Sequence, residues 1–247
     1  MFLPSSKDAL HKAWLYRTLT AIIDDQYLFD CLRFKGGTCS AMQSYLDRFS
    51  IDLDFDYVGH KKDLPQINKH LEDIFSNLGL EIKDQSQNTP QYFLKYPAKT
   101  DIRNTLKVDI TFPPPKSNKY ETIRFKEIDR LIQAQTIESM FANKLVALIE
   151  RFEKNNSIAG RDVYDIHHYF LNGYKYDQNI ILERRKISDL KIFFTELKLF
   201  IEKNITEKII TQDLNMLLSP EQFQKIRKIL KKEVSMFIQD EISRITK

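Results

Sequence analysis

Three aspartates alternate with apolar residues over positions 51–56 of this 247-residue chain. A β-strand places every second side chain on one face, so Asp52, Asp54 and Asp56 would form a row of carboxylates. Carboxylates about 4 Å apart repel one another by roughly 1 kcal/mol in water, and more when they are partly buried. Mg²⁺ relieves such repulsion, because it binds carboxylate oxygens together with substrate phosphates. The run therefore predicts a strand that holds a divalent cation for phosphate chemistry.

A later acidic position fits the same chemistry. Asp109 alternates with Val108 and Ile110 in the run LKVDIT, which places its side chain on the polar face of another predicted strand. We expect Asp52 and Asp54 to bind one or two Mg²⁺ ions, or Mn²⁺ in their place, with Asp109 adding a carboxylate. The alternative is that the three are unrelated surface acids.

A pair of glycines precedes the acidic run. Lys35-Gly36-Gly37-Thr38 lies between a predicted strand and a predicted helix, where glycine lets backbone amides approach a phosphate. The sequence matches neither the Walker A loop nor the dinucleotide-binding fingerprint. An isolated glycine pair is more often a plain turn. The nearby acids favour a phosphate-binding turn here.

The elements that must position these residues fall into two parts. Alternating apolar residues predict strands over 27–34, 51–58, 80–83, 91–96, 106–112 and 122–125. Helical spacing predicts N-terminal helices over 7–25, 38–46 and 60–78. Beyond Pro113-Pro114-Pro115 it predicts helices over 136–154, 161–171, 187–204, 206–218 and 220–245. We therefore expect an α/β (α+β) domain with a mixed sheet over residues 1–117 and a helical bundle over residues 118–247.

Composition excludes several classes of protein. Cys31 and Cys39 form no CxxC pair, which argues against a zinc site or a disulfide framework and favours a reducing compartment. No apolar run is long enough to span a membrane, and no signal-peptide pattern is present, so we expect a cytoplasmic protein without a membrane partner. The net charge of +4 lies wholly in residues 183–247. Such a segment suits an RNA partner or a solvated lysine-rich face.

Two blocks of sequence together resemble the AbiEii family of nucleotidyltransferase toxins, found in bacterial abortive-infection and toxin–antitoxin pairs. The first block is Gly36-Gly37-Thr38 followed by RFS and DLDF within residues 48–55. The second is NKLVAL with Arg151, followed by RDVYDI at residues 161–166. The resemblance spans residues 34–169 and implies a polymerase-β-like nucleotidyltransferase lobe followed by a helical bundle.

The resemblance also assigns roles to residues. Those it places at the nucleotide are Lys35, Gly36, Gly37, Thr38, Ser50 and Lys144. Those it implies for catalysis are Asp52, Asp54, Lys144 and Asp162. Further members of the same motifs are Arg48, Arg151, Arg161 and Asp165. The helical domain would contribute Lys144 and Asp162 to a cleft between the two domains.

The implied activity is the Mg²⁺-dependent transfer of a nucleoside monophosphate from an NTP to an acceptor hydroxyl. The expected acceptor is the 3′ end of tRNA, and a cognate antitoxin is the expected partner. Two alternatives stay open. One is a transferase that modifies a small molecule, such as an aminoglycoside, or a protein hydroxyl. The other is a partner-binding module that keeps the fold without turnover.

Overall fold

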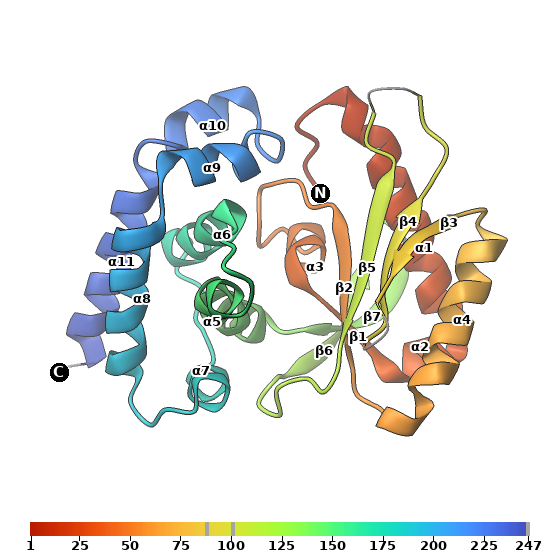
Figure 1. The fold of residues 1–247 in the computed structure, drawn as a ribbon, viewed down its shortest axis with the longest axis horizontal. Helices are drawn as coiled ribbons and strands as arrows, with labels where there is room; N and C mark the ends of the chain where they lie inside the picture. Colours follow the sequence, from red (N-terminus) through yellow and green to blue (C-terminus); the bar gives the residue numbers. More distant parts are fainter. Residues whose placement is uncertain (87–88, 100–101, 246–247) are drawn as a thin grey trace. The chain divides into compact units, whose positions relative to one another are not determined.

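The strands of the N-terminal half form one mixed sheet. The computed structural model describes residues 1–86, 89–99 and 102–245. Within them the sheet has seven strands in the order β3-β4-β5-β2-β1-β7-β6 (Figure 1). The strands are β1 (Leu32–Lys35), β2 (Asp52–Tyr57), β3 (Glu81–Gln85), β4 (Gln91–Lys95), β5 (Thr105–Thr111), β6 (Tyr120–Phe125) and β7 (Arg130–Gln135). The central strand β2 is antiparallel to β1 and parallel to β5, so the predicted mixed sheet is confirmed.

Helices cover this sheet and bury its apolar residues. They are α1 (Ala9–Asp24), α2 (Gln26–Cys31), α3 (Gly36–Met42) and α4 (Leu64–Asn77), with short 3-10 turns at Ser6–Asp8 and Lys61–Asp63. Helix α3 packs against β1 and β2, and α1 packs against β2, β5 and β7 (Figure 1). Leu53 and Phe55 on β2 are fully buried, as the alternation of the acidic strand predicts.

One predicted strand begins as a helix. Residues 27–34 read as extended from their apolar content, but the first part of this segment is α2 and only its end is β1. The Asp25 side chain accepts a hydrogen bond from the backbone N–H of Leu28 at 2.9 Å, which caps α2. A local cap therefore outweighs the β propensity of the segment.

The sheet continues past the expected domain boundary at residue 117. Strand β7 pairs with β6 and, through Phe34 and Ala134, with β1. Its sequence, RLIQAQ, alternates too weakly to predict a strand. The chain divides into one unit of residues 1–114 and 119–135, and a second unit of residues 115–118 and 136–247.

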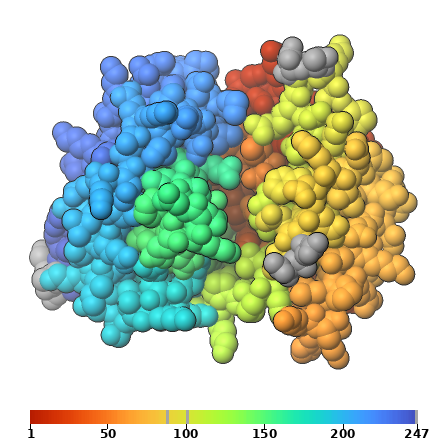
Figure 2. Space-filling view, viewed as in Figure 1, coloured from red at the N-terminus to blue at the C-terminus, as the bar shows by residue number. Residues whose placement is uncertain are grey.

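The second unit is helical. Its helices are α5 (Ile137–Asn155), α6 (Gly160–Leu171), α7 (Gln178–Arg185), α8 (Leu190–Asn204), α9 (Glu207–Leu214), α10 (Pro220–Ile226) and α11 (Leu230–Ile245). Helix α6 packs against α5, α9 and α11, and α8 packs against α11. The single helix expected over residues 220–245 is two helices, and α7 has no counterpart in the prediction. The exposed end of α5 and the residues after it form the green patch of Figure 2.

A helix must be long and apolar to cross a membrane. Among the described residues, no helix combines the length and the apolar character that crossing a membrane requires.

Candidate active site

The register of the sheet brings the predicted acids of the first unit together. Asp54 on β2 lies opposite Lys35 on β1 and opposite Asp109 on β5. Burial raises the pKa of the Asp54 carboxyl to about 6, and the charges of Asp52 and Asp109 add to this increase. No described residue donates a hydrogen bond to this carboxylate. Asp54 is therefore a crowded anion that lacks a hydrogen-bond donor from the described part of the chain.

The glycine turn passes directly over this anion. Gly36 has a φ of +78°, and a Cβ atom at this position would lie 2.3 Å from Oδ2 of Asp54. A Cβ atom on Gly37 would lie 2.8 Å from both Nη2 of Arg48 and Oγ of Ser50. Position 36 therefore requires glycine because of its left-handed backbone and the nearby carboxylate, and Gly37 leaves room for the side chains of Arg48 and Ser50. The structure brings five predicted site residues into one cluster.

Thr38 ties the same turn to the acidic strand. Its side chain is fully buried, and its hydroxyl donates a hydrogen bond to the carbonyl oxygen of Asp52. Arg48 is also buried, and its Nη1 donates to the carbonyl oxygen of Phe49 at 2.9 Å. In this structure, Thr38, a predicted nucleotide-site residue, and Arg48, a further member of the motif, make internal contacts that support the turn and the start of β2.

The third aspartate of the row has a different environment. Asp56 is fully buried; its Oδ1 accepts a hydrogen bond from Nζ of Lys35 at 2.7 Å. Its Oδ2 accepts from the Tyr120 hydroxyl at 2.9 Å and from Nε2 of Gln135 at 2.6 Å. Lys35 also donates to the Thr111 hydroxyl at 2.7 Å. The ammonium that the sequence assigns to the nucleotide therefore neutralises Asp56.

Asp109 also has protein donors. Its Oδ2 accepts hydrogen bonds from Nε2 of Gln91 at 3.0 Å and from Nζ of Lys107 at 2.5 Å. The negative charge of Asp109 contributes to the raised pKa of Asp54, but one of its oxygens is already shared by two donors. Asp109 is thus a weaker candidate for a metal ligand than Asp54.

The residues of this cluster fit a divalent cation held by two carboxylates. Mg²⁺ in phosphate-transfer sites takes one or two carboxylates and completes its shell with waters and substrate phosphates. A cation at Asp54 would offset both the burial and the repulsion that raise the pKa of this group. Among the described residues, no group of three or more His, Cys, Asp or Glu side chains has the arrangement of a metal site. Asp52 and Asp54 would therefore share the cation with substrate oxygens.

The second unit holds a separate cluster of predicted residues. Lys144 on α5 places Nζ 2.9 Å from Oδ1 of Asp162 and 3.0 Å from Oδ2 of Asp165, both on α6. Arg151 lies two helical turns after Lys144 on α5, and its Nη2 is 3.2 Å from Oδ2 of Asp162. Both aspartates are fully buried. One lysine therefore contacts two buried acids and joins the two helices, and Arg151 adds a second positive charge at Asp162.

Opposite charges decide the ionisation of Asp162. Burial alone would raise the pKa of this carboxyl, but Lys144, Arg151 and Arg161 lower it to about 2. The carboxylate is therefore ionised at neutral pH. This cluster holds the lysine ammonium in place.

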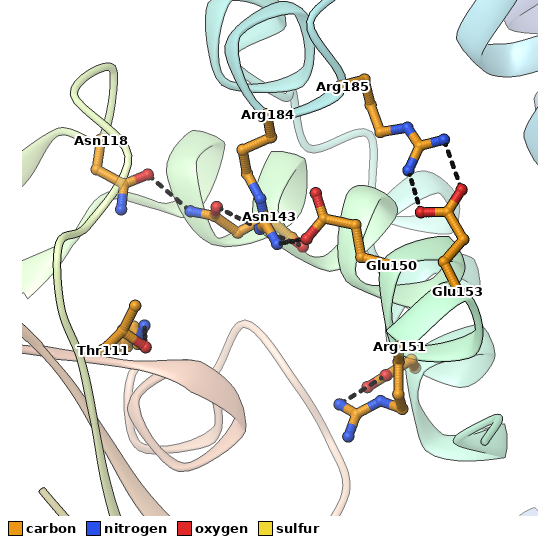
Figure 3. Close-up of polar contacts among 10 residues, drawn as sticks. Thr111, Asn118, Asn143, Glu150, Arg151, Glu153, Arg184 and Arg185 are labelled. Atoms are coloured by element: carbon orange, nitrogen blue, oxygen red, sulfur yellow. Dashed lines mark hydrogen bonds and ion pairs between the residues drawn. The ribbon is translucent and has the colours of Figure 1, made fainter. Parts of the chain in front are cut away.

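Residues of α7 hold the neighbouring part of α5. Arg184 donates to Oδ1 of Asn143 at 2.8 Å and also pairs with Glu150, and Asn143 donates to Oδ1 of Asn118 at 2.8 Å (Figure 3). Arg185 donates to Glu153 at 2.7 and 2.9 Å (Figure 3). Asn143 directly precedes Lys144. Sequence analysis missed this support because it did not predict α7.

Replacing Asp54 should stabilise the protein, whereas replacing Asp56 should destabilise it. A raised pKa means that the folded state disfavours the ionised carboxylate, so its stability falls as pH rises from about 4 to about 6. In the absence of divalent cations, Asp54→Asn should raise the free energy of unfolding at pH 7 by about 1 to 3 kcal/mol. Asp56→Asn should lower it by about 3 kcal/mol, because Lys35 loses its charged partner. Urea unfolding in EDTA measures both; equal losses in the two variants would contradict the assignment.

Replacing Lys144 should lower the free energy of unfolding, because the cluster on α5 and α6 loses its central cation. Lys144→Ala leaves Asp162 and Asp165 buried without their shared cation and should cost about 3 to 5 kcal/mol. Arg151→Ala, the matched control, removes one partly exposed partner and should cost about 1 kcal/mol. The lowered pKa of Asp162 means that its contribution is full above pH 4 and is lost as pH falls towards 2. Urea unfolding at pH 7 and at pH 3 should show a smaller acid-induced loss in Lys144→Ala than in the unmodified protein. If Lys144→Ala and the unmodified protein lost the same amount of stability between pH 7 and pH 3, this role of Lys144 would be refuted.

Solved structures share this fold over nearly all of the chain. The JHP933 protein of Helicobacter pylori is 20% identical, with a TM-score of 0.60, and the match covers 99% of this chain and 95% of that one. A putative nucleotidyltransferase of H. pylori is 19% identical, with a TM-score of 0.60 and coverage of 98% and 97%. The MenT4 nucleotidyltransferase toxin of Mycobacterium tuberculosis H37Rv is 14% identical, with a TM-score of 0.55 and coverage of 97% and 87%. At these identities the likeness shows the fold.

Sequence comparison identifies the family. Curated proteins gave no match to this chain. The family model described as nucleotidyl transferase AbiEii toxin, type IV TA system, matches residues 17–240. The match extends on both sides of residues 34–169, which carry the recognisable motifs. Because it covers most of the chain, this protein belongs to the AbiEii family of nucleotidyltransferase toxins of type IV toxin–antitoxin systems.

Proposed function

We propose that this nucleotidyltransferase requires Mg²⁺ and moves a nucleoside monophosphate from an NTP to the 3′ end of tRNA. The observation that carries the metal and nucleotide part is the contact between the glycine turn and the acidic strand. A Cβ atom on Gly36 would lie 2.3 Å from an oxygen of Asp54, whose carboxylate has no hydrogen-bond donor among the described residues. The backbone of Gly36 and the carboxylate of Asp54 therefore lie in close contact.

The residues of the first unit would divide the work of binding. Gly36 and Gly37 would present backbone amides to the triphosphate, and their lack of side chains leaves room for Asp54, Arg48 and Ser50 beside the turn. Asp52 and Asp54 would hold the Mg²⁺. When bound, Mg²⁺ supplies positive charge that neutralises the phosphates and the departing pyrophosphate. Lys35, Asp56 and Gln135 keep the strands in register beneath the site.

The reaction forms one phosphorus–oxygen bond and breaks another. The acceptor hydroxyl attacks the α-phosphate, and the bond between the α-phosphate and pyrophosphate breaks. We assign Lys144 to the nucleotide phosphates, with Asp162 and Asp165 holding its ammonium in place. The side chain of Lys144 is 17% exposed, so part of it stays accessible within the second unit.

An RNA acceptor and an antitoxin partner follow from charge and family. The positive excess of the chain lies in residues 183–247, and cationic surfaces favour a polyanion such as RNA. Several cations there are already paired: Arg184 and Arg185 bind acids of α5, Lys225 lies 2.6 Å from Glu221, and Arg227 lies 3.8 Å from Glu207. The type IV toxin–antitoxin family supports an antitoxin partner in the same cell. We place the reaction in the cytoplasm, where tRNA and NTPs are both available.

A transfer assay tests this proposal. The purified protein is incubated with Mg²⁺, each labelled NTP, and total RNA, protein extract or aminoglycosides as acceptors. Label should enter tRNA at its 3′ end, and Asp54→Asn should reduce transfer by about a hundredfold or more, because the cation loses a carboxylate. Asp84→Asn, a change at an exposed aspartate on β3, should leave the rate unchanged.

Each other outcome of the assay has a definite reading. Label only in protein or in aminoglycoside would overturn the tRNA acceptor while keeping the transferase. Full activity of Asp54→Asn, or activity in EDTA, would overturn the metal assignment. No transfer to any acceptor, together with unchanged growth inhibition by Asp54→Asn in cells, would favour a partner-binding module.

A further inference from the structure

We propose that His11 is a positioning residue that fixes the start of the metal-binding strand, an inference that rests on the proposed function. His11 is fully buried on α1, and its Nε2 lies 2.9 Å from the carbonyl oxygen of Ile51. Ile51 sits between Ser50, which lies against the glycine turn, and Asp52, the first residue of β2. A constraint on Ile51 therefore acts on both neighbours.

The partners of the imidazole determine where its hydrogen lies. A carbonyl oxygen only accepts hydrogen bonds, so Nε2 carries the hydrogen and donates it to Ile51. Burial lowers the pKa of His11 to about 4, and although the bond to Ile51 opposes this change, the charge of Arg103 adds to it. The ring is therefore neutral near pH 7, and Nδ1 is an acceptor. The Tyr96 hydroxyl lies 2.6 Å from Nδ1 and 2.7 Å from the carbonyl oxygen of Arg103. These two acceptors share its one hydrogen.

Packing fixes the orientation of the ring. His11 makes an edge contact with Phe49 at a centroid distance of 6.0 Å, and Tyr96 stacks on Trp14 at 5.5 Å with an interplanar angle of 24°. Rings held in this way leave the imidazole little freedom to turn. The donor on Nε2 is therefore aimed permanently at Ile51.

Two side chains from different elements thus hold consecutive carbonyl groups. His11 from α1 holds the carbonyl of Ile51, and Thr38 from α3 holds the carbonyl of Asp52. Groups that orient a metal ligand without touching the metal affect its affinity strongly. The carboxylate of Asp52 would otherwise swing with the loop that precedes β2. His11 acts through the backbone, and it does not contact the reacting groups.

Two substitutions separate the two hydrogen bonds of His11. Glutamine places its amide nitrogen where Nε2 lies and keeps the donor to Ile51, whereas asparagine places its amide oxygen near Nδ1 and keeps only the acceptor for Tyr96. Calorimetry with Mn²⁺ and a non-hydrolysable NTP analogue gives the dissociation constant, and circular dichroism on the same samples checks that each variant is fully folded. His11→Asn should weaken binding about tenfold or more, and His11→Gln should remain close to the unmodified protein.

The outcomes distinguish this inference from the function on which it rests. If the unmodified protein binds no Mn²⁺ with the analogue, the proposed function and the role of His11 both fail. If it binds, and His11→Asn binds equally well or His11→Gln is weakened just as much as His11→Asn, only the role of His11 is overturned. Nitrogen-15 NMR of the imidazole adds a readout without metal: a hydrogen on Nε2 is expected, and a hydrogen on Nδ1 would also overturn the inference.

Discussion

Repulsion between carboxylates on the central strand is the constraint on which the first unit depends. Asp54 and Asp56 lie two residues apart on β2, but their carboxylates differ in the hydrogen-bond donors around them. Asp56 receives a lysine, a tyrosine and a glutamine as donors, so its charge is compensated inside the fold. Asp54 receives no such donor from the described residues and carries a raised pKa. The described residues thus supply donors to Asp56 and none to Asp54.

The second unit solves a related problem with one lysine. Lys144 bridges Asp162 and Asp165, and the net effect of its charge and of the nearby arginines is a lowered pKa at Asp162. Burial and neighbouring like charges raise the pKa of Asp54, whereas Lys144 together with Arg151 and Arg161 outweighs the effect of burial at Asp162. The two motifs of this chain therefore differ in charge balance. The acidic strand carries a carboxylate with a raised pKa, and the pair of helices carries an ion cluster around one ammonium.

The parts of the structure that local pattern controls could be predicted from sequence. Alternation placed Leu53 and Phe55 in the core and the acids on the other face, and the spacing of apolar residues located α5 and α6. Sequence could not show the environment of Asp56. Besides Lys35, its donors are Tyr120 and Gln135, which lie 64 and 79 residues away along the chain. Strand β7 is defined by its pairing with β1 and β6, which a weakly alternating sequence does not reveal. The role of His11 likewise depends on a contact across 40 residues.

The central claim is that Asp54 lacks a donor because it binds a divalent cation together with a nucleotide. Anomalous diffraction from crystals soaked with Mn²⁺ and a non-hydrolysable NTP analogue tests it most directly. The account predicts a manganese peak within about 2.0 to 2.2 Å of carboxylate oxygens of Asp52 and Asp54, with the triphosphate beside Gly36 and Gly37. A bound nucleotide with no manganese at Asp54, or with Asp54 paired to a protein side chain instead, would contradict it.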